Sequence, residues 1–385
     1  MPELKDAMIV GAVRTPIGRG HEKKGYYKDI HPAQLLGRTY SELLTRAAID
    51  PIEVDLVIAG CVNQFGEQGT NIARNAWLAE GLPLTTAATT IDVQCGSAHQ
   101  AINFAAAQIA LGAADVVIGA GVEHMGHISF ADVEAVQAEH GHPYTAELLA
   151  RYAIVGQGLG AEMIADEWGA TRAEMDELAL RSQQLAHAAT NRGAFTREIV
   201  TVGDTPTIDQ GIRPDSSLET LAALKPVFKP DGKITAGNSS QISDGAAAVL
   251  VMSADKAGAL GLKPRARIVD QAAVGCDPVK MLEGPIPVTE KLLQRNRLRI
   301  DDIDYFEINE AFAPVVLAWS RAHRPDTARV NPRGGAMALG HPLGSTGARL
   351  VTTLLHELED DDRELGLVAM CCGGGLGTGT LIQRV

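Results

Sequence analysis

Short apolar runs alternate with longer segments of helical periodicity along the first hundred residues. Residues 7–13 (AMIVGAV) and 54–62 (VDLVIAGCV) are apolar almost throughout, as strands buried on both faces are. Residues 31–49 and 71–82 instead place their apolar side chains at helical spacing. Strands that alternate with helices in this way predict an α/β layer with a mostly parallel sheet.

The middle of the chain, residues 123–240, does not continue this alternation. It is more polar and less regular, and its clear helical segment covers residues 171–193. Thr171 is expected to cap this helix, with Glu174 at the capping-box position. The pattern therefore predicts a large insertion that carries loops.

The alternation of strands and helices resumes after the insertion. The predicted elements are strands at 245–253, 265–275, 304–309, 366–372 and 377–385, and helices at 287–297 and from residue 311 onward.

Weak internal symmetry accompanies this return. Residues 94–106 and 341–353 share one order, in which a reactive residue is followed by small residues and then by a helix. Residues 54–62 and 303–311 are both strands that follow an acidic turn. Duplication and chance both explain a likeness this loose. A duplicated α/β unit would place the two reactive helix starts near a central axis.

Composition and charge narrow the class of protein. The 385 residues are 45% hydrophobic and 21% charged, which is typical of a soluble globular chain. A net charge of −13 without a long basic run argues against nucleic-acid binding. No apolar run reaches the roughly 18 residues that a membrane span needs.

The cysteine content indicates the compartment. The chain has five scattered cysteines, an odd number that does not suggest a disulfide framework, and its start lacks the pattern of a signal peptide. We therefore expect a reduced, cytoplasmic protein. The cysteines are Cys61, Cys95, Cys276, Cys371 and Cys372.

Cys95 lies where a β-prone run meets a helix rich in small residues. A thiol at a helix start faces unpaired N–H groups and the positive end of the helix dipole. This placement is expected to lower the thiol pKa and to favour a nucleophilic thiolate. A buried, inert core thiol is the alternative interpretation.

Three further motifs carry candidate chemistry. His341 lies in a glycine-rich turn that leads into a helix. It is interpreted either as a general base or as an exposed loop side chain without a role in catalysis. Cys371 comes shortly before three glycines, whose N–H groups can converge on an oxyanion. Asn309 could hold a water or a carbonyl oxygen by its amide, or only cap the following helix. His124 and His127 could suggest a metal, but no further ligand cluster follows them and we expect none.

Taken together, these motifs resemble those of the thiolase family. "QCGS", "NEAFA", "GGAMALGHPLGSTGAR" and "CCGGG" occur in the family's order and at its spacing, and "IVGAVRTPIGR" and "GNSSQISDGAAAVLVMS" are also similar to its signatures. The resemblance covers essentially the whole chain. It implies a duplicated α/β core with α-β-α-β-α layers and an inserted loop domain. The implied domains are an N-terminal core at 1–121, an inserted loop domain that binds CoA at 122–244, return strands at 245–268 and a C-terminal core at 269–385.

The resemblance assigns catalytic roles by matching position. Cys95 would be the acylated nucleophile, and His341 would activate it. Cys371 would move the proton at the α-carbon of the substrate, whereas the cysteine that follows it would be structural. Asn309 would hold a water that forms one oxyanion site together with His341. The backbone N–H groups of Cys95 and Gly373 would form the other oxyanion site.

The resemblance also implies coenzyme A as co-substrate, no permanently bound cofactor, and a homodimer or a homotetramer built as a dimer of dimers. Lys225 and Lys229 add local positive charge for an anionic ligand, although such side chains are usually only solvated. The residues at the family's CoA-binding positions are Arg213 near the adenine and ribose phosphate, Thr220, Ala236 and Ser240 along the pantetheine path, and Phe312 beside it.

The activity that the resemblance implies is CoA-dependent thiolysis of a 3-ketoacyl-CoA, in β-oxidation of fatty acids or sterol side chains. Short-chain biosynthetic thiolases carry a His-Met pair where this chain has Gly156 and Gln157. The loss of bulk favours longer or bulkier acyl groups. Residues 60–83 and the stretch NSSQISDG are similar to actinobacterial thiolases of steroid or fatty-acid breakdown.

Four alternatives stay open at this point. A biosynthetic acetoacetyl-CoA thiolase would use the same residues in the direction of condensation. A degenerate CoA-binding scaffold would need none of the reactive side chains, all of which are present here. A ketoacyl synthase lacks the second catalytic cysteine, and a cysteine protease needs no glycine-rich loop or CoA-binding insertion.

Overall fold

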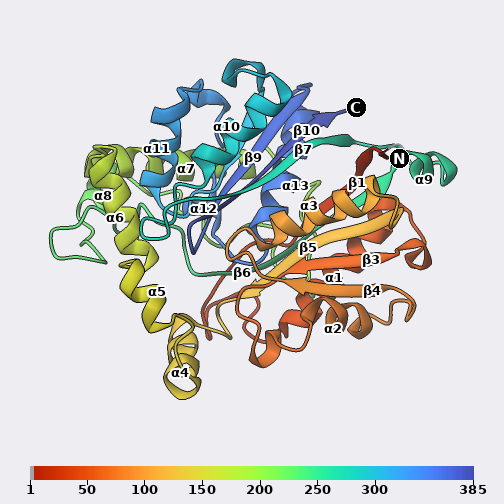
Figure 1. The fold of residues 1–385 in the computed structure, drawn as a ribbon, viewed down its shortest axis with the longest axis horizontal. Coiled ribbons are helices and arrows are strands. Elements are labelled where there is room, and N and C mark those ends of the chain that lie inside the picture. Colours follow the sequence, from red (N-terminus) through yellow and green to blue (C-terminus); the bar gives the residue numbers. More distant parts are fainter. Residues whose placement is uncertain (1–3) are drawn as a thin grey trace.

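The computed structural model describes residues 4–385, so the first three residues of the predicted 1–121 core lie outside it. Ten strands form one mixed sheet in the order β4-β3-β5-β6-β1-β7-β10-β9-β8, with β2 beside β6 (Figure 1). The strands are β1 (Ala7–Arg14), β2 (Gly18–Arg19), β3 (Leu56–Gly60), β4 (Ala87–Ile91), β5 (Val116–His124), β6 (Ser243–Ser253), β7 (Ala266–Gly275), β8 (Tyr305–Ile308), β9 (Leu365–Cys372) and β10 (Leu376–Arg384).

The sheet is mostly antiparallel, so the prediction of a mostly parallel sheet is wrong. Parallel pairing is confined to β3 with β4 and β5, and to β8 with β9. The other pairs, from β5–β6 through to β10–β9, run antiparallel. Helices cover both faces of most of these strands. Apolar runs therefore indicate burial on both faces and not strand direction.

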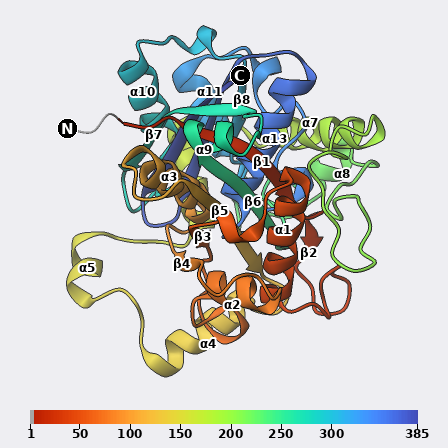
Figure 2. The same ribbon diagram turned by 90° about the vertical axis from the view of Figure 1, so that its right-hand side faces the viewer.

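The helices complete five layers, as predicted. Helices α1 and α2 cover the outer face of the strands from β4 to β1, and α10 and α11 cover the outer face of the strands from β7 to β8. Helices α3 and α13 lie between the two groups of strands and contact both (Figures 1 and 2). The helices are α1 (Pro32–Ala47), α2 (Ile72–Ala79), α3 (Ser97–Ala110), α4 (Phe130–His140), α5 (Ala146–Arg151), α6 (Gln157–Glu167), α7 (Arg172–Asn191), α8 (Leu218–Ala222), α9 (Ala254–Ala259), α10 (Pro285–Asn296), α11 (Ala313–His323), α12 (Ala336–Leu339) and α13 (Thr346–Asp360).

The suspected duplication is confirmed by equivalent strand pairing in the two halves and by an aspartate that holds the same place before a strand in each half. Asp55 precedes β3 and accepts the two backbone N–H groups that lead into β5. Asp304 precedes β8 and does the same for the first residues of β9. At the seam between the halves, Met8 of β1 pairs with Arg267 of β7. These two residues hold the same place in their halves, so a pseudo-twofold axis passes between them.

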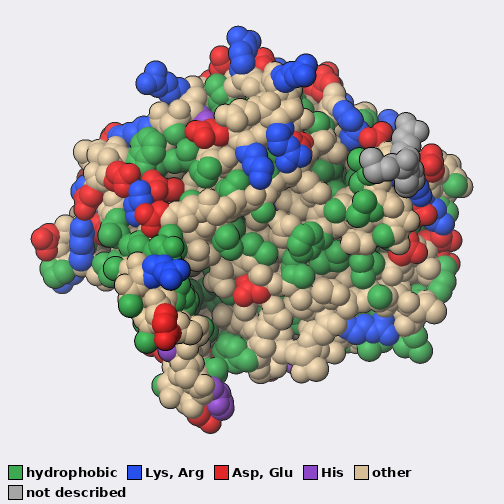
Figure 3. All heavy atoms as spheres, in the orientation of Figure 1, with side chains coloured by type: hydrophobic (Ala, Val, Ile, Leu, Met, Phe, Trp, Pro, Cys, Tyr) green, Lys and Arg blue, Asp and Glu red, His purple; other side chains and the backbone are tan. Residues whose placement is uncertain are grey.

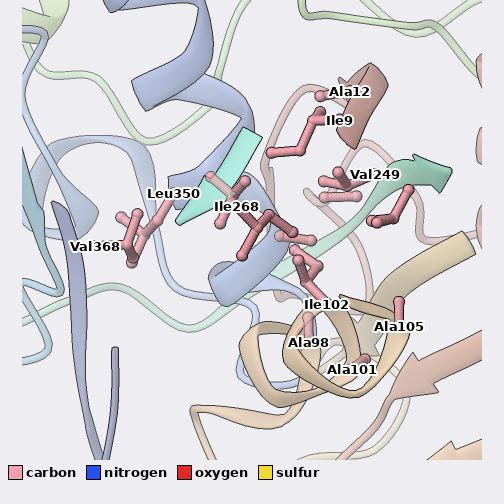
Figure 4. Close-up of a cluster of buried hydrophobic side chains, with 14 of the residues drawn as sticks. Ile9, Ala12, Ala98, Ala101, Ile102, Ala105, Val249, Ile268, Leu350 and Val368 are labelled. Carbon is pink, nitrogen blue, oxygen red and sulfur yellow. The ribbon is translucent and has the colours of Figure 1, made fainter. Parts of the chain in front are cut away.

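The central layer depends on small residues. Helix α3 is rich in alanine, and Ile102 on it converges with Leu350 of α13 and Ile268 of β7 (Figure 4). The two helices approach closely where Gly347 of α13 meets His99 of α3. A Cβ atom at Gly347 would lie 2.3 Å from the backbone nitrogen of His99. Helices with larger side chains at this crossing could not bring their starts together.

The region between β5 and β6 contains more helix than the sequence pattern predicts. The predicted helix is α7, and Thr171 and Glu174 form its capping box as expected. Helices α4 and α5 were not predicted, because neither buries a side chain and so neither has an apolar stripe. They form an arm that projects from the body (Figures 1 and 2). The predicted domain limits stay a prediction. None of the helices in residues 4–385 is long and apolar enough to cross a membrane.

Candidate active site

Cys95 lies in the tight turn between β4 and α3. Gln94 before it has a left-handed backbone with φ 51°, which turns the chain sharply into the helix. The Cys95 side chain is buried, and the N–H groups of Gly373 and of Cys95 itself face its sulfur. Burial nevertheless raises the pKa of the Cys95 thiol to about 12. The predicted lowering of this pKa is wrong, because desolvation outweighs the helix start. A neighbouring base must therefore remove the proton.

His341 lies in the loop before α13 and is held in one tautomer. Its Nδ1 is 2.6 Å from the Thr346 hydroxyl, which in turn donates to the backbone oxygen of Pro342 at 2.8 Å. A hydroxyl whose proton is used in this way accepts, so Nδ1 carries the hydrogen and Nε2 has the free lone pair. Burial lowers the pKa of His341 to about 3, so the imidazole is neutral and able to accept a proton.

Asn309 joins the histidine to the second cysteine. Its buried Nδ2 lies 3.4 Å from His341 Nε2 and 3.8 Å from Cys371 Sγ. Its Oδ1 is buried without a hydrogen-bond partner among residues 4–385. The helix that follows is capped by Phe312, so the interpretation of Asn309 as a helix cap is wrong.

The adjacent cysteines at the end of β9 point in opposite directions, as successive strand residues do. Cys371 belongs to the apolar cluster beneath the insertion, on the side of Asn309. Cys372 belongs to the central layer and packs against Gly96. Burial raises the pKa of both thiols above the ordinary range. Cys371 is therefore the one of the pair that can meet a group held by Asn309.

The five predicted catalytic residues converge on one place. Cys95 faces the amide of Gly373, and Cys371 is close enough to Cys95 for the Cys95 charge to add to the burial that raises the pKa of the Cys371 thiol. His341 and Asn309 complete the group through their contact with each other. Two thiols, a neutral imidazole, a side-chain amide and backbone donors thus lie close together, which is the set of groups that acyl transfer requires.

A cavity of about 870 Å³ opens beside Gly373. A Cβ atom at Gly156 would meet nothing within 4 Å, whereas Gln157 Nε2 lies 3.0 Å from the Cβ position at Gly373. The arm of α4 and α5 forms the outer wall, and Figure 3 shows apolar side chains along the hollow between arm and body. The lining residues nearest the thiol turn are Asp92, Val93, Gln94, Gln157, Gly373 and Gly374.

The residues at the predicted CoA positions form a strip on one side of the insertion. Arg213 reaches the side chain of Gln241 at 3.4 Å, beside Ser240. The Ser240 N–H donates to the backbone oxygen of Ala311. The ring of the next residue, Phe312, lies edge-on against Phe228 at 5.9 Å between centroids. Thr220 and Ala236 are exposed along the same side, where Leu221 of α8 meets Gly237.

The two lysines near this strip differ in pairing. Lys229 lies 3.2 Å from the carboxylate of Asp166, so part of its charge is engaged within the insertion. Lys225 is exposed and has no ion-pair partner within residues 4–385.

His124 and His127 have their nitrogens occupied by protein groups. Their rings stack at 3.8 Å between centroids. His124 Nε2 lies 2.9 Å from the backbone oxygen of Tyr27, and His127 contacts Glu67 and the Lys28 backbone. In the described part of the chain, no three metal-ligating side chains form a group that could hold an ion.

Sequence reasoning missed two residues that contact the reactive loops. Thr346 sets the His341 tautomer, and its place five residues after the histidine was the available signal. Glu123 accepts the N–H of Gly344 at 2.9 Å. Its signal was a carboxylate at the end of an otherwise apolar strand.

The fold and the site together define an acyl-transfer enzyme with a duplicated α/β core, and comparison with known proteins identifies the family. The model of the thiolase N-terminal domain matches residues 7–255, and the model of the thiolase C-terminal domain matches residues 262–384. The chain therefore belongs to the thiolase family of acyltransferases.

Several relatives align over nearly the full length. A steroid 3-ketoacyl-CoA thiolase of Mycobacterium tuberculosis, FadA6, is 45% identical over 99% of this chain and 95% of its own length. The acetyl-CoA acetyltransferase of Bacillus anthracis has a TM-score of 0.90 at 37% identity, with all of both chains covered. The human mitochondrial 3-ketoacyl-CoA thiolase in complex with CoA has a TM-score of 0.88 at 34% identity, covering 99% of this chain and 98% of that one.

Proposed function

We propose that this thiolase cleaves a 3-ketoacyl-CoA with coenzyme A, releasing acetyl-CoA and a shortened acyl-CoA, in β-oxidation of fatty acids or sterol side chains. One observation carries the proposal. The Asn309 amide is within reach of both His341 and Cys371, while the amides of Cys95 and Gly373 face the Cys95 sulfur. A nucleophile, a base and an acid therefore surround one reacting carbon.

In the first half-reaction, His341 Nε2 takes the Cys95 proton and the sulfur attacks the 3-keto carbon. The C–S bond forms, the bond between C2 and C3 breaks, and its electron pair stays on C2. Cys371 protonates that carbon and acetyl-CoA leaves. A water on Asn309, together with His341, stabilises the enolate oxygen. The unpaired Asn309 Oδ1 offers that water an acceptor.

In the second half-reaction, the Cys371 thiolate removes the proton from incoming coenzyme A. The CoA sulfur then attacks the acyl carbonyl, whose oxygen is held by the amides of Cys95 and Gly373. The acyl–enzyme bond breaks, and Cys95 regains its proton from His341. Both cysteines and the histidine return to their starting protonation states, and no external oxidant is involved.

Coenzyme A would lie along the strip on the insertion described above. Lys225 and Arg213 supply cationic groups there for the phosphates, although the whole chain carries a net charge of −13. The FadA6 relative acts on steroid substrates by its name, and the human relative binds CoA. Both support this class of substrate for the present chain.

We propose acyl groups longer than acetoacetyl for the cavity beside Gly373. Its volume of about 870 Å³ and the open space at Gly156 favour them. A biosynthetic acetoacetyl-CoA thiolase is the second candidate, favoured by the likeness to the acetyltransferase of Bacillus anthracis. The two functions differ in the acyl group that the cavity accepts.

Intact-mass spectrometry with matched substrates tests both candidates. The enzyme is mixed with acetoacetyl-CoA or 3-ketodecanoyl-CoA in the absence of free coenzyme A, and the adduct on Cys95 is followed. A decanoyl-chain substrate should leave an octanoyl adduct, and its kcat/KM in the presence of coenzyme A should exceed that of acetoacetyl-CoA. A preference for acetoacetyl-CoA would favour the biosynthetic candidate, and no adduct with either would indicate a scaffold.

We also propose a homodimer, or a dimer of two such dimers, in the cytoplasm. Strand β4 is an edge strand with a partly exposed surface, which supports pairing with a second copy. The five cysteines are free thiols, as in a reducing compartment. Light scattering after gel filtration measures the number of copies, and a monomer at micromolar concentration would refute the assembly.

A further inference from the structure

The two reactive loops are the corresponding parts of the two halves of the fold. Gly96 opens α3 and Gly344 precedes α13 in matching sequence. The helices cross at His99 and Gly347, each three residues further along its own loop. The pseudo-twofold axis therefore relates residues 94–97, the Cys95 loop, to residues 342–345, which belong to the His341 loop, residues 340–345.

The same axis relates Glu123 on β5 to Cys372 on β9. The residue after the capping aspartate is Leu56 in one half and Tyr305 in the other. Leu56 pairs with Val117, and Tyr305 pairs with Gly366. Glu123 and Cys372 stand equally far beyond these partners, at the ends of their strands.

Glu123 holds the His341 loop, although the two lie on opposite halves. Its buried carboxylate accepts the Gly344 N–H at 2.9 Å and the Val62 N–H at 2.9 Å on one oxygen. The other oxygen accepts from the Asn63 backbone at 3.2 Å and from the Gln68 amide at 2.8 Å. No cation within residues 4–385 pairs with it, so this carboxylate is committed to organising backbone.

Any side chain at position 344 would force the backbone around it to move. A Cβ atom there would lie 2.5 Å from the backbone oxygen of Val122 and 2.7 Å from the Glu123 carboxylate. The His341 loop thus lies directly on the β5 backbone. Because Val62 and Asn63 also line the cavity beside Gly373, one carboxylate fixes the base loop relative to the wall of that cavity.

Cys372 stands in the equivalent contact with the Cys95 loop. The Cys372 sulfur packs directly on Gly96, where a Cβ atom would lie 2.5 Å from that sulfur, while the Gly96 N–H donates to the Val93 backbone oxygen within the turn. The helix start that follows the nucleophile is therefore held by the C-terminal half of the chain.

We propose that Glu123 and Cys372 are positioning residues that hold the reactive loops crosswise. Glu123 on the N-terminal half fixes the loop of His341, and Cys372 on the C-terminal half fixes the loop of Cys95. The catalytic consequence rests on the thiolysis proposed above, since positioning matters only if His341 activates Cys95. The crosswise contact itself does not depend on that activity.

Hydrogen exchange of the loop peptides tests the crosswise arrangement. Glu123→Gln leaves one oxygen in place of two, so two of the four N–H groups lose their acceptor. It should speed amide exchange in residues 340–346 and leave residues 94–97 as in the wild type. Cys372→Ala should do the opposite, and Cys372→Ser, which restores a side-chain atom at the place of the sulfur, should return exchange toward wild type. Changes confined to each variant's own half would overturn the proposal.

Single-turnover acylation with 3-ketodecanoyl-CoA gives the catalytic readout. In Glu123→Gln, Cys95 should still reach full acylation, but at a rate lower by about tenfold or more, since small misplacements of a base are costly. A merely structural role would lower the acylated fraction or the melting temperature and leave the rate of the folded fraction unchanged. Glu123→Leu removes both acceptors, so the folded fraction of this variant should acylate Cys95 more slowly still.

Glu162→Gln is the matched control. Glu162 is another buried carboxylate that accepts backbone N–H groups, those of Lys233 and Ile234, and it does not contact either loop. Its acylation rate at saturating substrate should stay within about twofold of wild type. Rates of Glu123→Gln and Cys372→Ala that match this control would refute the positioning role. A wild type that forms no adduct would refute the thiolysis alone, because the exchange experiment still decides the crosswise contact.

Discussion

The Cys95 loop and the His341 loop occupy equivalent places in the two halves of the fold, but they carry different chemical groups and pack against different surroundings. Both end at the start of a central-layer helix. The Cys95 loop is bounded at Gly96 by side chains, those of Cys372 and Thr378, whereas the His341 loop rests at Gly344 on the backbone of β5. The Cys95 loop therefore rests on side chains that can move, and the His341 loop rests on backbone that cannot move without disturbing the strand.

Removing the two functional groups should have the largest effect and tests whether the loops cooperate. Cys95→Ala should lower kcat by roughly 10⁴-fold or more and abolish the acyl adduct. His341→Ala should lower the single-turnover acylation rate by about 10²–10⁴-fold, since only the base is lost. Intact mass over time separates the two. An adduct in Cys95→Ala would place the nucleophile elsewhere.

Alanine substitutions of Gly344 and Gly96 should show more directly how rigid the contact beneath each loop is. Gly344→Ala pushes against backbone, so the loop must move and acylation should slow by about 10²-fold. Gly96→Ala pushes against side chains that can turn away, and it should cost less than about tenfold. Adding Cys372→Ala to Gly96→Ala should restore part of the rate, because the sulfur is then gone. Equal losses in both single variants would contradict the difference between the supports.

The pH dependence of Cys95 alkylation tests the resting protonation states of Cys95 and His341. Burial raises the pKa of Cys95 to about 12 and lowers that of His341 to about 3, so the resting pair is neutral thiol and neutral imidazole. Below the thiol pKa, the thiolate fraction grows about tenfold with each pH unit. The rate of Cys95 alkylation by iodoacetamide should thus rise about tenfold per unit from pH 7 to pH 9. A plateau in that range would indicate a preformed thiolate.

Thr346→Val should have the smallest effect. It removes the acceptor that keeps hydrogen on His341 Nδ1, while the ring stays buried between the same neighbours. A neutral hydrogen bond of this kind contributes about 1 kcal/mol, so acylation should slow by about fivefold. Thr346→Ser keeps the hydroxyl and serves as the control, and it should stay close to wild type.

The layers and most elements could be predicted because their residues alternate cleanly between buried and exposed positions. Helices α1 and α7 and strands β1 and β3 appear within a few residues of their predicted bounds. Strand direction could not be predicted, since a strand covered by helices on both faces is apolar whichever way its neighbours run. Helices α4 and α5 bury no side chain and left no signal.

The candidate site residues could be proposed from the sequence because each lies in a short contiguous motif that resembles one of the thiolase family. Their surroundings could not. The pKa of Cys95 follows from burial by segments far along the chain, and this outweighs the local helix start that the sequence displays. Glu123 and Gly344 are 221 positions apart, and only the fold brings them to 2.9 Å.

The crossing of the two central helices at His99 and Gly347 has a consequence for biosynthesis. The amino-terminal half leaves the ribosome before the strand and the loop that pack beside Cys95 have been made. On the mechanism proposed above, Cys95 can form an acyl–enzyme only when residues 341–372 have been synthesised and have folded around it.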